Sequence, residues 1–441
     1  MTSRTPTSGA ETFWPPATAG SDQAQAVRPA SQGRAGQPSS QNRAAPSASQ
    51  DRATPAAGAN PAMPAEGQNR AVPAEGQNRA MRTPTPADVA ALLKARGGMT
   101  IERHLTDEQR AAALEADVRH GLTVTPKDLP PTWFYDATGS MLFGKITELP
   151  KYYQTRAEQA ILAARGTTLA SELTAAFPGG VDTLVELGSG TSDKTRMLLA
   201  ALASTGRLRR FVPLDVDADT LAQAGSAARA AHPGLAVHAV VGDFRQHLSL
   251  LPVGSATGQP GGTLVAFLGG TIGNLRPPER VALLTELRSR VASRPPGSAE
   301  AGGRGGALLL GTDLVKDPAR LVAAYDDSAG VTAAFNRNLL TVLNRELGAD
   351  FDLRGFAHVA VWDDQNRWIE MRLRAVREQT VKVTALDLTV DFAENEEMRT
   401  EISAKFDRET VEAELAATGW RLAHWWTDEP GDFALSLAIA D

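Results

Sequence analysis

The stretch VELGSGTSDKTRMLL, residues 185–199, decides the fold. An apolar run reaches Glu186 and then breaks into a turn that contains Gly188 and Gly190, and a helix-like pattern follows at once. Bare backbone at the two glycines permits a tight turn and lets a ligand come close between a strand and a helix. A lone Gly-x-Gly is weak evidence, so the elements around it must show which ligand it holds.

Short apolar runs alternate with helical stretches along the middle of the chain. They cover residues 181–187, 211–216, 236–244, 263–270 and 307–314. This alternation predicts an α/β fold whose strands form a doubly wound, parallel sheet. The Pro/Gly-rich connections at 252–262 and 293–306 are expected to be surface loops.

After residue 315 the alternation stops. We expect helices over 317–348, antiparallel strands over 356–383 and 386–392, and a C-terminal hairpin of 420–426 and 433–440. That hairpin could close the edge of the parallel sheet. Ahead of the glycine turn, residues 107–122 have helical spacing, and Thr155 with Glu158 predicts a capping box at the start of another helix.

Acids at the strand ends indicate which nucleotide the glycine turn holds. Asp193 stands where the dinucleotide fingerprint has its third glycine, which disfavours a pyrophosphate and a dehydrogenase, and no Gly-Lys-Ser/Thr follows for a triphosphate. Asp215 ends the second strand, where a carboxylate can accept two ribose hydroxyls. Asp243 and Phe244 end the third, where they could bond an adenine amino group and pack on the ring. This order resembles class I S-adenosylmethionine-dependent methyltransferases, whose cationic sulfonium tolerates an acidic loop.

The bulk composition excludes several classes of protein. The chain has 441 residues, a net charge of -6 and no basic block, which argues against nucleic acid as a partner. It has no cysteine, and its seven histidines lack ligand spacing, so no metal is expected. No apolar run approaches the roughly 20 residues that cross a bilayer, and no secretory signal is evident at the N-terminus. We therefore expect a cytoplasmic protein without a membrane partner.

Residues 1–86 form a low-complexity leader. They are mainly Ala, Pro, Gly, Ser, Gln, Asn and Arg, and the octapeptide PAEGQNRA at 64–71 recurs at 73–80. Such a segment buries too little apolar surface to offset its ordering entropy, so we expect it to be disordered. A tethering arm is an alternative that the residues leave open.

Seven stretches, in order from about residue 107 to the C-terminus, carry a dense resemblance to a known family. They are PPTWFYDATGSMLFGKIT, LPKYYQTRAEQAIL, LVELGSGTSDKTRMLL, FLGGTIGNL, LLGTDLVKD, YDDSAGVTAAFNRN and EISAKF. Together they resemble the histidine-specific Nα-methyltransferases of ergothioneine biosynthesis. The family's loop usually reads GST where this chain has GGT, with Gly270 in place of the serine.

The resemblance implies a Rossmann-like class I methyltransferase domain with an inserted α+β substrate-binding domain. The implied boundaries place the helical part of the substrate domain at 87–156, the S-adenosylmethionine-binding domain at 157–315 and the substrate-binding insertion at 316–404. Strands in 405–441 would complete the methyltransferase sheet. The implied reaction transfers three methyl groups from S-adenosylmethionine to the α-amino nitrogen of L-histidine and yields hercynine. A monomer is expected.

The family's site residues carry over by motif position. Gly188, Lys194, Asp215, Asp243 and Phe244 would line the cofactor site. Tyr152, Asn274 and Tyr325 would contact the substrate carboxylate, and Gly269 would offer its carbonyl to the amine. Tyr135 would lie near the methionine end and orient the amine, and it is taken with Asn274 as catalytic. Glu401 and Ser403 would hold the imidazole.

The residues by themselves leave alternatives open at several of these positions. Glu401 and Ser403, two apart on a strand, share one face and can grip an imidazole, but Glu401 also ends the acidic run ENEEMRTE and could be solvated. An aromatic face at Tyr135 or Phe143 could accommodate the cationic product. Rival functions are a methyltransferase for another free amino acid or amine and a catalytically silent cofactor-binding module.

Overall fold

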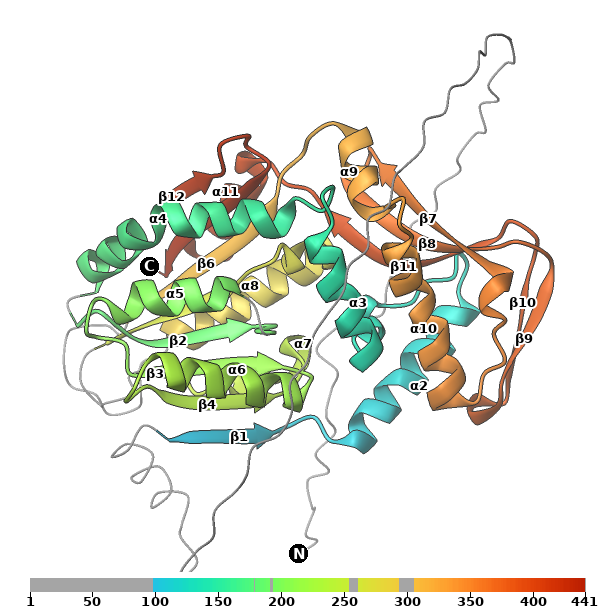
Figure 1. Ribbon diagram of the computed structural model, residues 1–441, viewed down its shortest axis with the longest axis horizontal. Coiled ribbons are helices and arrows are strands. Elements are labelled where there is room, and N and C mark those ends of the chain that lie inside the picture. Colours follow the sequence, from blue (N-terminus) through green and yellow to red (C-terminus); the bar gives the residue numbers. More distant parts are fainter. Residues whose placement is uncertain (1–97, 178, 191–192, 254–260, 293–304, 441) are drawn as a thin grey trace, which may run out of the picture. The chain divides into compact units, whose positions relative to one another are not determined.

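The computed structural model describes residues 98–440, apart from 178, 191–192, 254–260 and 293–304 (Figure 1). The predicted leader at 1–86 lies outside the described residues. So do the stretch that follows it up to residue 97 and most of the two Pro/Gly-rich connections.

One large sheet organises the described chain. Its eight strands lie in the order β1-β4-β3-β2-β5-β6-β13-β12. Their bounds are β1 Met99–Arg103, β2 Val181–Leu187, β3 Arg210–Asp215, β4 Ala236–Val241, β5 Gly262–Phe267, β6 Gly306–Asp313, β12 Trp420–Thr427 and β13 Phe433–Ala440. The strands from β1 to β6 pair in parallel, and β13 runs antiparallel between β6 and β12. The predicted parallel sheet and its closing hairpin are thus confirmed.

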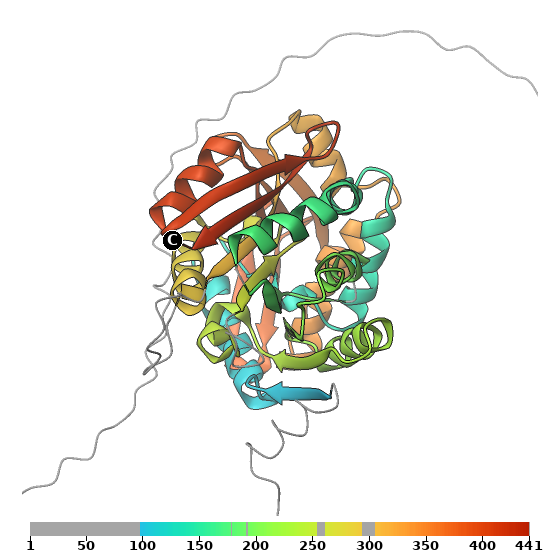
Figure 2. The ribbon, with the colours of Figure 1, turned by 90° about the vertical axis from the view of Figure 1, so that its left-hand side faces the viewer.

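The sequence predicted one edge of this sheet and missed the other. The C-terminal hairpin forms one edge and β1 the other (Figure 2). β1 lies parallel to β4, with Met99 opposite Val237, and no strand was expected there. Its sequence, MTIER, offers only two large apolar residues, so its pairing with β4 decides its conformation.

Helices cover both faces of the sheet because its central strands are apolar throughout. All seven residues of β2 are buried, as expected for a parallel strand with layers on both sides. On one face α4 (Gln154–Ala176) and α5 (Asp193–Ala203) share a core with β2 and β5, and α6 (Ala218–Ala231) contributes to the same core. On the other face α8 (Pro277–Ala292) and α11 (Arg408–Ala417) pack on the same strands. The short α7 (Phe244–His247) and η2 (Leu248–Leu250) follow β4.

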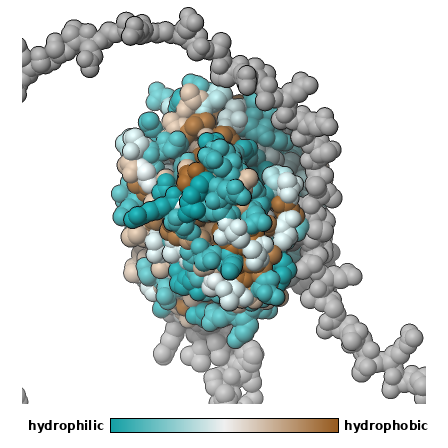
Figure 3. All heavy atoms as spheres, turned by 90° about the vertical axis from the view of Figure 1, so that its right-hand side faces the viewer, coloured by the Kyte–Doolittle hydropathy of each residue, from teal (hydrophilic) through white to brown (hydrophobic). Residues whose placement is uncertain are grey.

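Segments from both sides of the parallel strands build a second lobe around a separate core. Before β2 they are α2 (Asp107–Thr123), η1 (Pro131–Phe134) and α3 (Ala137–Glu148); after β6 they are α9 (Pro318–Tyr325), α10 (Val331–Leu347), η4 (Leu353–Gly355), β7 (Phe356–Asp363), β8 (Trp368–Ala375), β9 (Gln379–Val383), η5 (Thr384–Leu386), β10 (Leu388–Phe392) and β11 (Glu397–Ala404). The strands form a three-stranded antiparallel sheet, β11-β8-β7, and a β9-β10 hairpin. Their inward side chains share one core with α2, α3, α9 and α10. The face that carries β9 and β10 is mainly hydrophilic (Figure 3).

The end of β11 joins this lobe to the large sheet. The Phe406 amide donates to the Asp313 carbonyl at 2.8 Å, and the Val315 amide donates to the Phe406 carbonyl at 2.9 Å. The turn η3 (Thr271–Asn274), which follows β5, packs against β11 and β6. The carboxyl ends of β5 and β6 therefore meet the carboxyl end of β11.

The predicted capping box at Thr155 and Glu158 is wrong. Helix α4 already begins at Gln154, and its N-cap residue, Tyr153, makes no side-chain capping bond. Glu158 is fully buried, and its carboxylate accepts from the Gly269 amide, at 2.9 Å to Oε2, and from Lys194 Nζ at 2.7 Å. The local pattern was read correctly as a helix start, but the acid serves a contact 111 residues away.

We expect the aromatic core of the second lobe to dominate its stability. Phe134 is fully buried, and its ring centroid lies 4.7 Å from that of Phe335. Phe134→Ala should lower the free energy of unfolding by about 3–5 kcal/mol in urea titration, through lost burial and a cavity. Val376→Ala, at a side chain that is 46% exposed, is the control and should change it by about 0.5 kcal/mol or less. Equal effects of the two substitutions would contradict this view of the core.

Candidate active site

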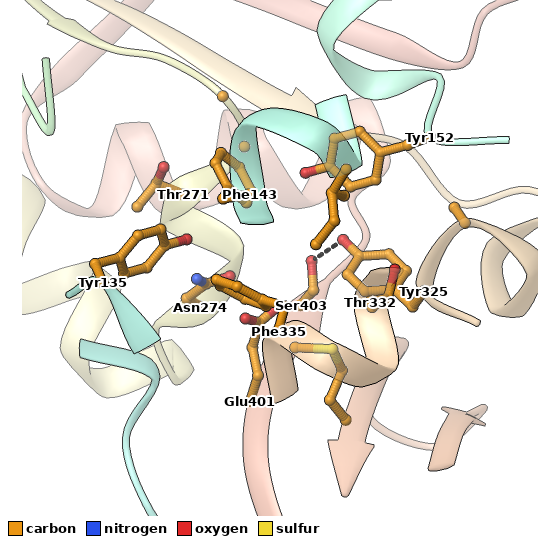
Figure 4. Close-up of a pocket in the computed structure, with 15 residues that line it drawn as sticks. Tyr135, Phe143, Tyr152, Thr271, Asn274, Tyr325, Thr332, Phe335, Glu401 and Ser403 are labelled. Carbon is orange, nitrogen blue, oxygen red and sulfur yellow. Dashed lines mark hydrogen bonds between the residues drawn. The ribbon is translucent and has the colours of Figure 1, made fainter. Parts of the chain in front are cut away.

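A cavity lies where η3 meets the second lobe (Figure 4). Its empty space amounts to about 510 Å³ when the part open to solvent is counted. The predicted residues that line it are Tyr135, Tyr152, Gly269, Asn274, Tyr325, Glu401 and Ser403. The six positions carried over for the substrate and the catalytic position Tyr135 therefore lie around one space, although they come from distant parts of the chain.

The fold brings these side chains in from separate elements. Tyr135 follows η1 and Tyr152 precedes α4, so both come from the chain ahead of the glycine turn. Asn274 ends η3 at the carboxyl end of β5, where ligands bind in open α/β sheets. Tyr325 ends α9, and Glu401 with Ser403 lies on β11.

Aromatic rings form one wall of the cavity. Tyr135 meets Phe143 and Phe335 edge-on, with ring centroids 5.6 Å apart in each pair. Phe143 in turn meets Tyr152, at 6.3 Å. Burial raises the pKa values of the Tyr135 and Tyr152 phenols well above their usual range. These phenols therefore keep their protons and can donate hydrogen bonds without introducing a charge.

Glu401 is the acid of this cavity. Its side chain is buried, and burial raises its pKa to about 7, although the positive charge of Lys405 acts in the opposite direction. Near neutral pH the group can therefore take or release a proton with little cost.

Ser403 and Tyr325 form a hydrogen-bonded pair that faces the cavity. Ser403 Oγ lies 2.8 Å from Tyr325 Oη (Figure 4). Behind them, Lys405 Nζ donates to Ser403 Oγ at 2.7 Å and to Tyr325 Oη at 3.0 Å. Sequence reasoning missed Lys405. The signal was present in EISAKF, because alternation along a strand puts Glu401, Ser403 and Lys405 on one side of the chain.

Lys405 also reaches Asp313, at the end of β6. Its Nζ lies 2.9 Å from Asp313 Oδ2, and Lys316 Nζ lies 2.6 Å from Oδ1. Tyr153 Oη donates to the same carboxylate at 2.8 Å. Burial favours the neutral acid, but the two ammonium groups outweigh it and hold the pKa of Asp313 below its usual range. The carboxylate is therefore ionised inside the protein.

Beside the cavity, the glycine turn presents bare backbone to open space. Gly188 and Gly190 have φ of +65° and +51°, and apart from their chain neighbours no atom of the described residues lies within 4 Å of the position that a Cβ would take on either. The Gly190 amide donates to Asp215 Oδ2 at 3.2 Å, which ties the turn to the end of β3. Glu186 fixes the turn from inside, since it accepts from Ser189 Oγ at 2.6 Å and from Thr195 Oγ1 at 2.8 Å.

The other predicted cofactor residues lie at the neighbouring strand ends. Asp243 caps α7 and pairs with Arg245 at 2.9 Å, and the ring of Phe244 meets Phe267 edge-on at 5.2 Å. Lys194, in the first turn of α5, pairs with Glu158 beside Gly269, which lines the cavity. The glycine turn and the cavity are thus linked through Lys194 and Glu158.

The Gly270 backbone accounts for the glycine in the GGT loop. Gly270 has φ of +71° and precedes η3, and a Cβ there would lie 3.5 Å from the Phe433 ring, an ordinary contact. A serine would fit the space but would strain the left-handed backbone. Glycine is therefore the relaxed choice at this position.

The described residues lack the features of two other classes of site. Within them, no three His, Asp or Glu side chains are grouped so that they could hold a metal ion. No helix of this part of the chain has the length and apolarity to cross a membrane.

The fold and the site define a class of protein. A parallel sheet carries an open glycine turn followed by acids at the next strand ends, and a neutral, aromatic-walled cavity lies at the same edge. These are the features of a class I S-adenosylmethionine-dependent methyltransferase.

Comparison with known proteins places the chain in a family of that class. Residues 114–440 match the family model described as histidine-specific methyltransferase, SAM-dependent. The chain is 55% identical over 341 residues to the histidine N-alpha-methyltransferase of Mycolicibacterium smegmatis, which covers 77% of this chain and 99% of that protein. The protein of the same name from Mycobacterium tuberculosis is 54% identical over 340 residues, with the same two shares. The chain therefore belongs to the histidine-specific, S-adenosylmethionine-dependent methyltransferase family.

A more distant relative carries the name of a pathway. Ergothioneine biosynthesis protein 1 of Neurospora crassa is 26% identical over 363 residues, which is 78% of this chain and 38% of that protein.

The buried acid should make the stability of the ligand-free protein depend on pH. The pKa of Glu401 rises from 4.5 to about 7 on folding, so the stability that this shift contributes is present below pH 4.5 and is lost as the pH rises through about 7. Glu401→Gln carries no such group. The unfolding free energy of Glu401→Gln minus that of the wild type should therefore increase by up to about 3 kcal/mol from pH 5 to pH 8, as measured by urea titration. Exposed Glu115→Gln is the control, and parallel curves for wild type and Glu401→Gln would contradict the assignment.

Proposed function

We propose that this protein transfers three methyl groups in turn from S-adenosylmethionine to the α-amino nitrogen of L-histidine and so forms hercynine, the first step of ergothioneine biosynthesis. One observation carries the proposal: Glu401 and Ser403, which can grip an imidazole, share a cavity with the neutral donors Tyr152, Asn274 and Tyr325. Membership of the histidine-specific family and the names of the relatives support it.

The residues at the glycine turn fit a cationic nucleoside. Gly188 and Gly190 leave room for close approach, and the acids Glu186 and Asp215 suit a positive ligand better than a phosphate. In this proposal Asp215 takes the ribose hydroxyls, Asp243 and Phe244 hold the adenine, and Gly188 and Lys194 complete the cofactor site. S-adenosylmethionine supplies, when bound, an electrophilic methyl group on a sulfonium.

The second lobe clamps the amino acid at both ends. Tyr152, Tyr325 and Asn274 donate to the carboxylate without adding a positive charge near a sulfonium. Glu401 and Ser403 hold the ring, and a site that pairs its buried polar groups with a substrate rejects analogues that leave them unpaired. Held at both ends, the amine can reach an in-line geometry, and such positioning is worth roughly 7–11 kcal/mol at best.

The amine itself needs little activation. An α-amino group titrates near pH 8 in peptides, and higher in a free amino acid because the adjacent carboxylate favours the ammonium form. A minor neutral fraction with a free lone pair therefore exists at pH 7 without a strong base. We assign Tyr135 and Asn274 to orient that lone pair, and Gly269 to accept an amine proton through its carbonyl. The faces of Tyr135 and Phe143 can attract the cationic product. The nitrogen must be neutral before each transfer, so a proton passes to solvent before each of the three methyl groups is added. Each transfer leaves S-adenosylhomocysteine, and the trimethylated product is a fixed cation without a proton on its nitrogen.

We further propose how the enzyme is organised. Residues 107–156 and 316–404 form the substrate domain around 157–315, and 405–441 completes the sheet; separate cores for the two lobes support this division. The lower bound of 87 that the resemblance implied does not hold, because β1 (Met99–Arg103) pairs with β4 in the large sheet. We propose a monomeric, cytoplasmic enzyme that works without a metal and without nucleic acid or membrane, in keeping with its mild acidity and its lack of cysteine.

Mass spectrometry of products tests the proposal. The purified protein, incubated with S-adenosylmethionine and each of the 20 amino acids in turn, should add three methyl groups to histidine alone. Glu401→Gln should lower kcat/KM for histidine by about 10-fold or more, because a hydrogen bond to a charged group is worth about 1.5–3 kcal/mol. Methylation of a different amino acid would support the acceptor alternative, and no methylation at all would favour a silent cofactor-binding module.

A further inference from the structure

Lys405 is a buried cation that has no role in the proposed reaction as described so far. The side chain of Lys405 has no exposed surface, and its Nζ touches three oxygens: Ser403 Oγ, Tyr325 Oη and Asp313 Oδ2. An ammonium group has three donors, so all of them are used. Lys405 is absent from the cavity lining, yet it contacts two residues that line it.

Neutralising Asp313 does not explain Lys405. That carboxylate already has Lys316 at 2.6 Å and accepts from Tyr153 Oη at 2.8 Å. A second ammonium adds another buried charge, and its desolvation is costly unless further contacts compensate for it. The other contacts of Lys405 are with the two hydroxyls of the cavity and with the Tyr325 ring, whose centroid lies 4.8 Å from Nζ.

Those contacts restrict where the hydroxyl protons point. Lysine only donates, so Ser403 Oγ and Tyr325 Oη must each accept from it. The two oxygens lie 2.8 Å apart, a distance at which a proton must lie between them. Of the two hydroxyl protons, one is thus committed to the pair, and at most one is left for a molecule in the cavity.

We propose that Lys405 is a positioning residue that makes Ser403 an acceptor, not a donor, toward the substrate ring. This inference rests on the proposed function. A substrate carboxylate can only accept, and charge-assisted bonds are the stronger ones, so the Tyr325 proton goes to the carboxylate. The Ser403 proton then lies between Ser403 and Tyr325, and the free lone pair of Ser403 faces the ring.

The consequence is a selection for ring N–H groups. Ser403 accepts from one ring nitrogen, and the carboxylate of Glu401 accepts from the other. Histidine supplies both protons when its ring is the imidazolium, which the carboxylate of Glu401 favours, whereas a ring with a bare nitrogen opposite Ser403 sets two lone pairs against each other. The site would thus recognise the proton on the ring as well as the ring's shape.

Two isomers of thiazolylalanine probe this directly. Thiazol-4-ylalanine and thiazol-5-ylalanine place an acceptor-only nitrogen at one or the other ring-nitrogen position of histidine. The dissociation constants of both isomers and of histidine are measured by calorimetry with S-adenosylhomocysteine present. In Lys405→Met the hydroxyl pair is released, and the preference for histidine over one isomer should fall about tenfold, the worth of one hydrogen bond. A loss of packing would weaken all three ligands alike.

Three further variants keep the test decisive. Asp313→Asn/Lys405→Met removes one charge of each sign and should show the same change if the single variant fails to fold. Ser403→Ala should also reduce the preference, and adding Lys405→Met to it should change nothing more, because the effect passes through Ser403.

The proposal is overturned if the preference is unchanged in both Lys405 variants, including the case in which neither isomer binds any of the proteins. It is also overturned if Lys405→Met still changes the preference in the Ser403→Ala background. If wild-type protein does not bind or methylate histidine, the proposed function itself fails, and that result is recorded before any variant is compared.

Discussion

The site depends on the joint between the end of β11 and the end of β6. Two backbone hydrogen bonds connect Phe406 to Asp313 and Val315, and the buried ion pair of Lys405 with Asp313 lies beside them. This joint fixes β11, so Glu401 and Ser403 face the turn after β5. Without it the large sheet would keep its glycine turn, and the second lobe its aromatic core, but no cavity would contain residues from both.

The polarity of the cavity follows from what it must hold. Its lining, as far as the structure describes it, contains no lysine or arginine, and its uncharged polar groups are phenols, the hydroxyls of Thr271, Thr332 and Ser403, an amide and backbone. Burial keeps the phenols protonated. Charges are placed just behind the wall: Lys405 behind Ser403, and Lys194 with Glu158 behind Gly269. Such a site can bind an anionic carboxylate without placing a lysine or arginine of the lining next to a cationic sulfonium.

Local signals predicted most of the fold, and long-range contacts account for the rest. The parallel strands and the closing hairpin were evident because apolar runs and strand-end acids are local patterns. β1 was missed because its weak sequence becomes a strand only beside β4. Glu158 was taken for a helix cap because its true partner, the Gly269 amide, is distant in sequence. The resemblance supplied positions that the fold brings together, but no motif revealed that Lys405 contacts Tyr325, since that contact spans 80 residues.

The central claim is that one cavity holds histidine at both ends and turns its amine toward the cofactor beside the glycine turn. A crystal structure of the protein with S-adenosylhomocysteine and L-histidine tests it most directly. The account predicts the ribose against Asp215, the imidazole between Glu401 and Ser403, and the amine aimed at the sulfur. An imidazole bound away from Glu401, or a nucleoside that does not touch Asp215, would contradict it.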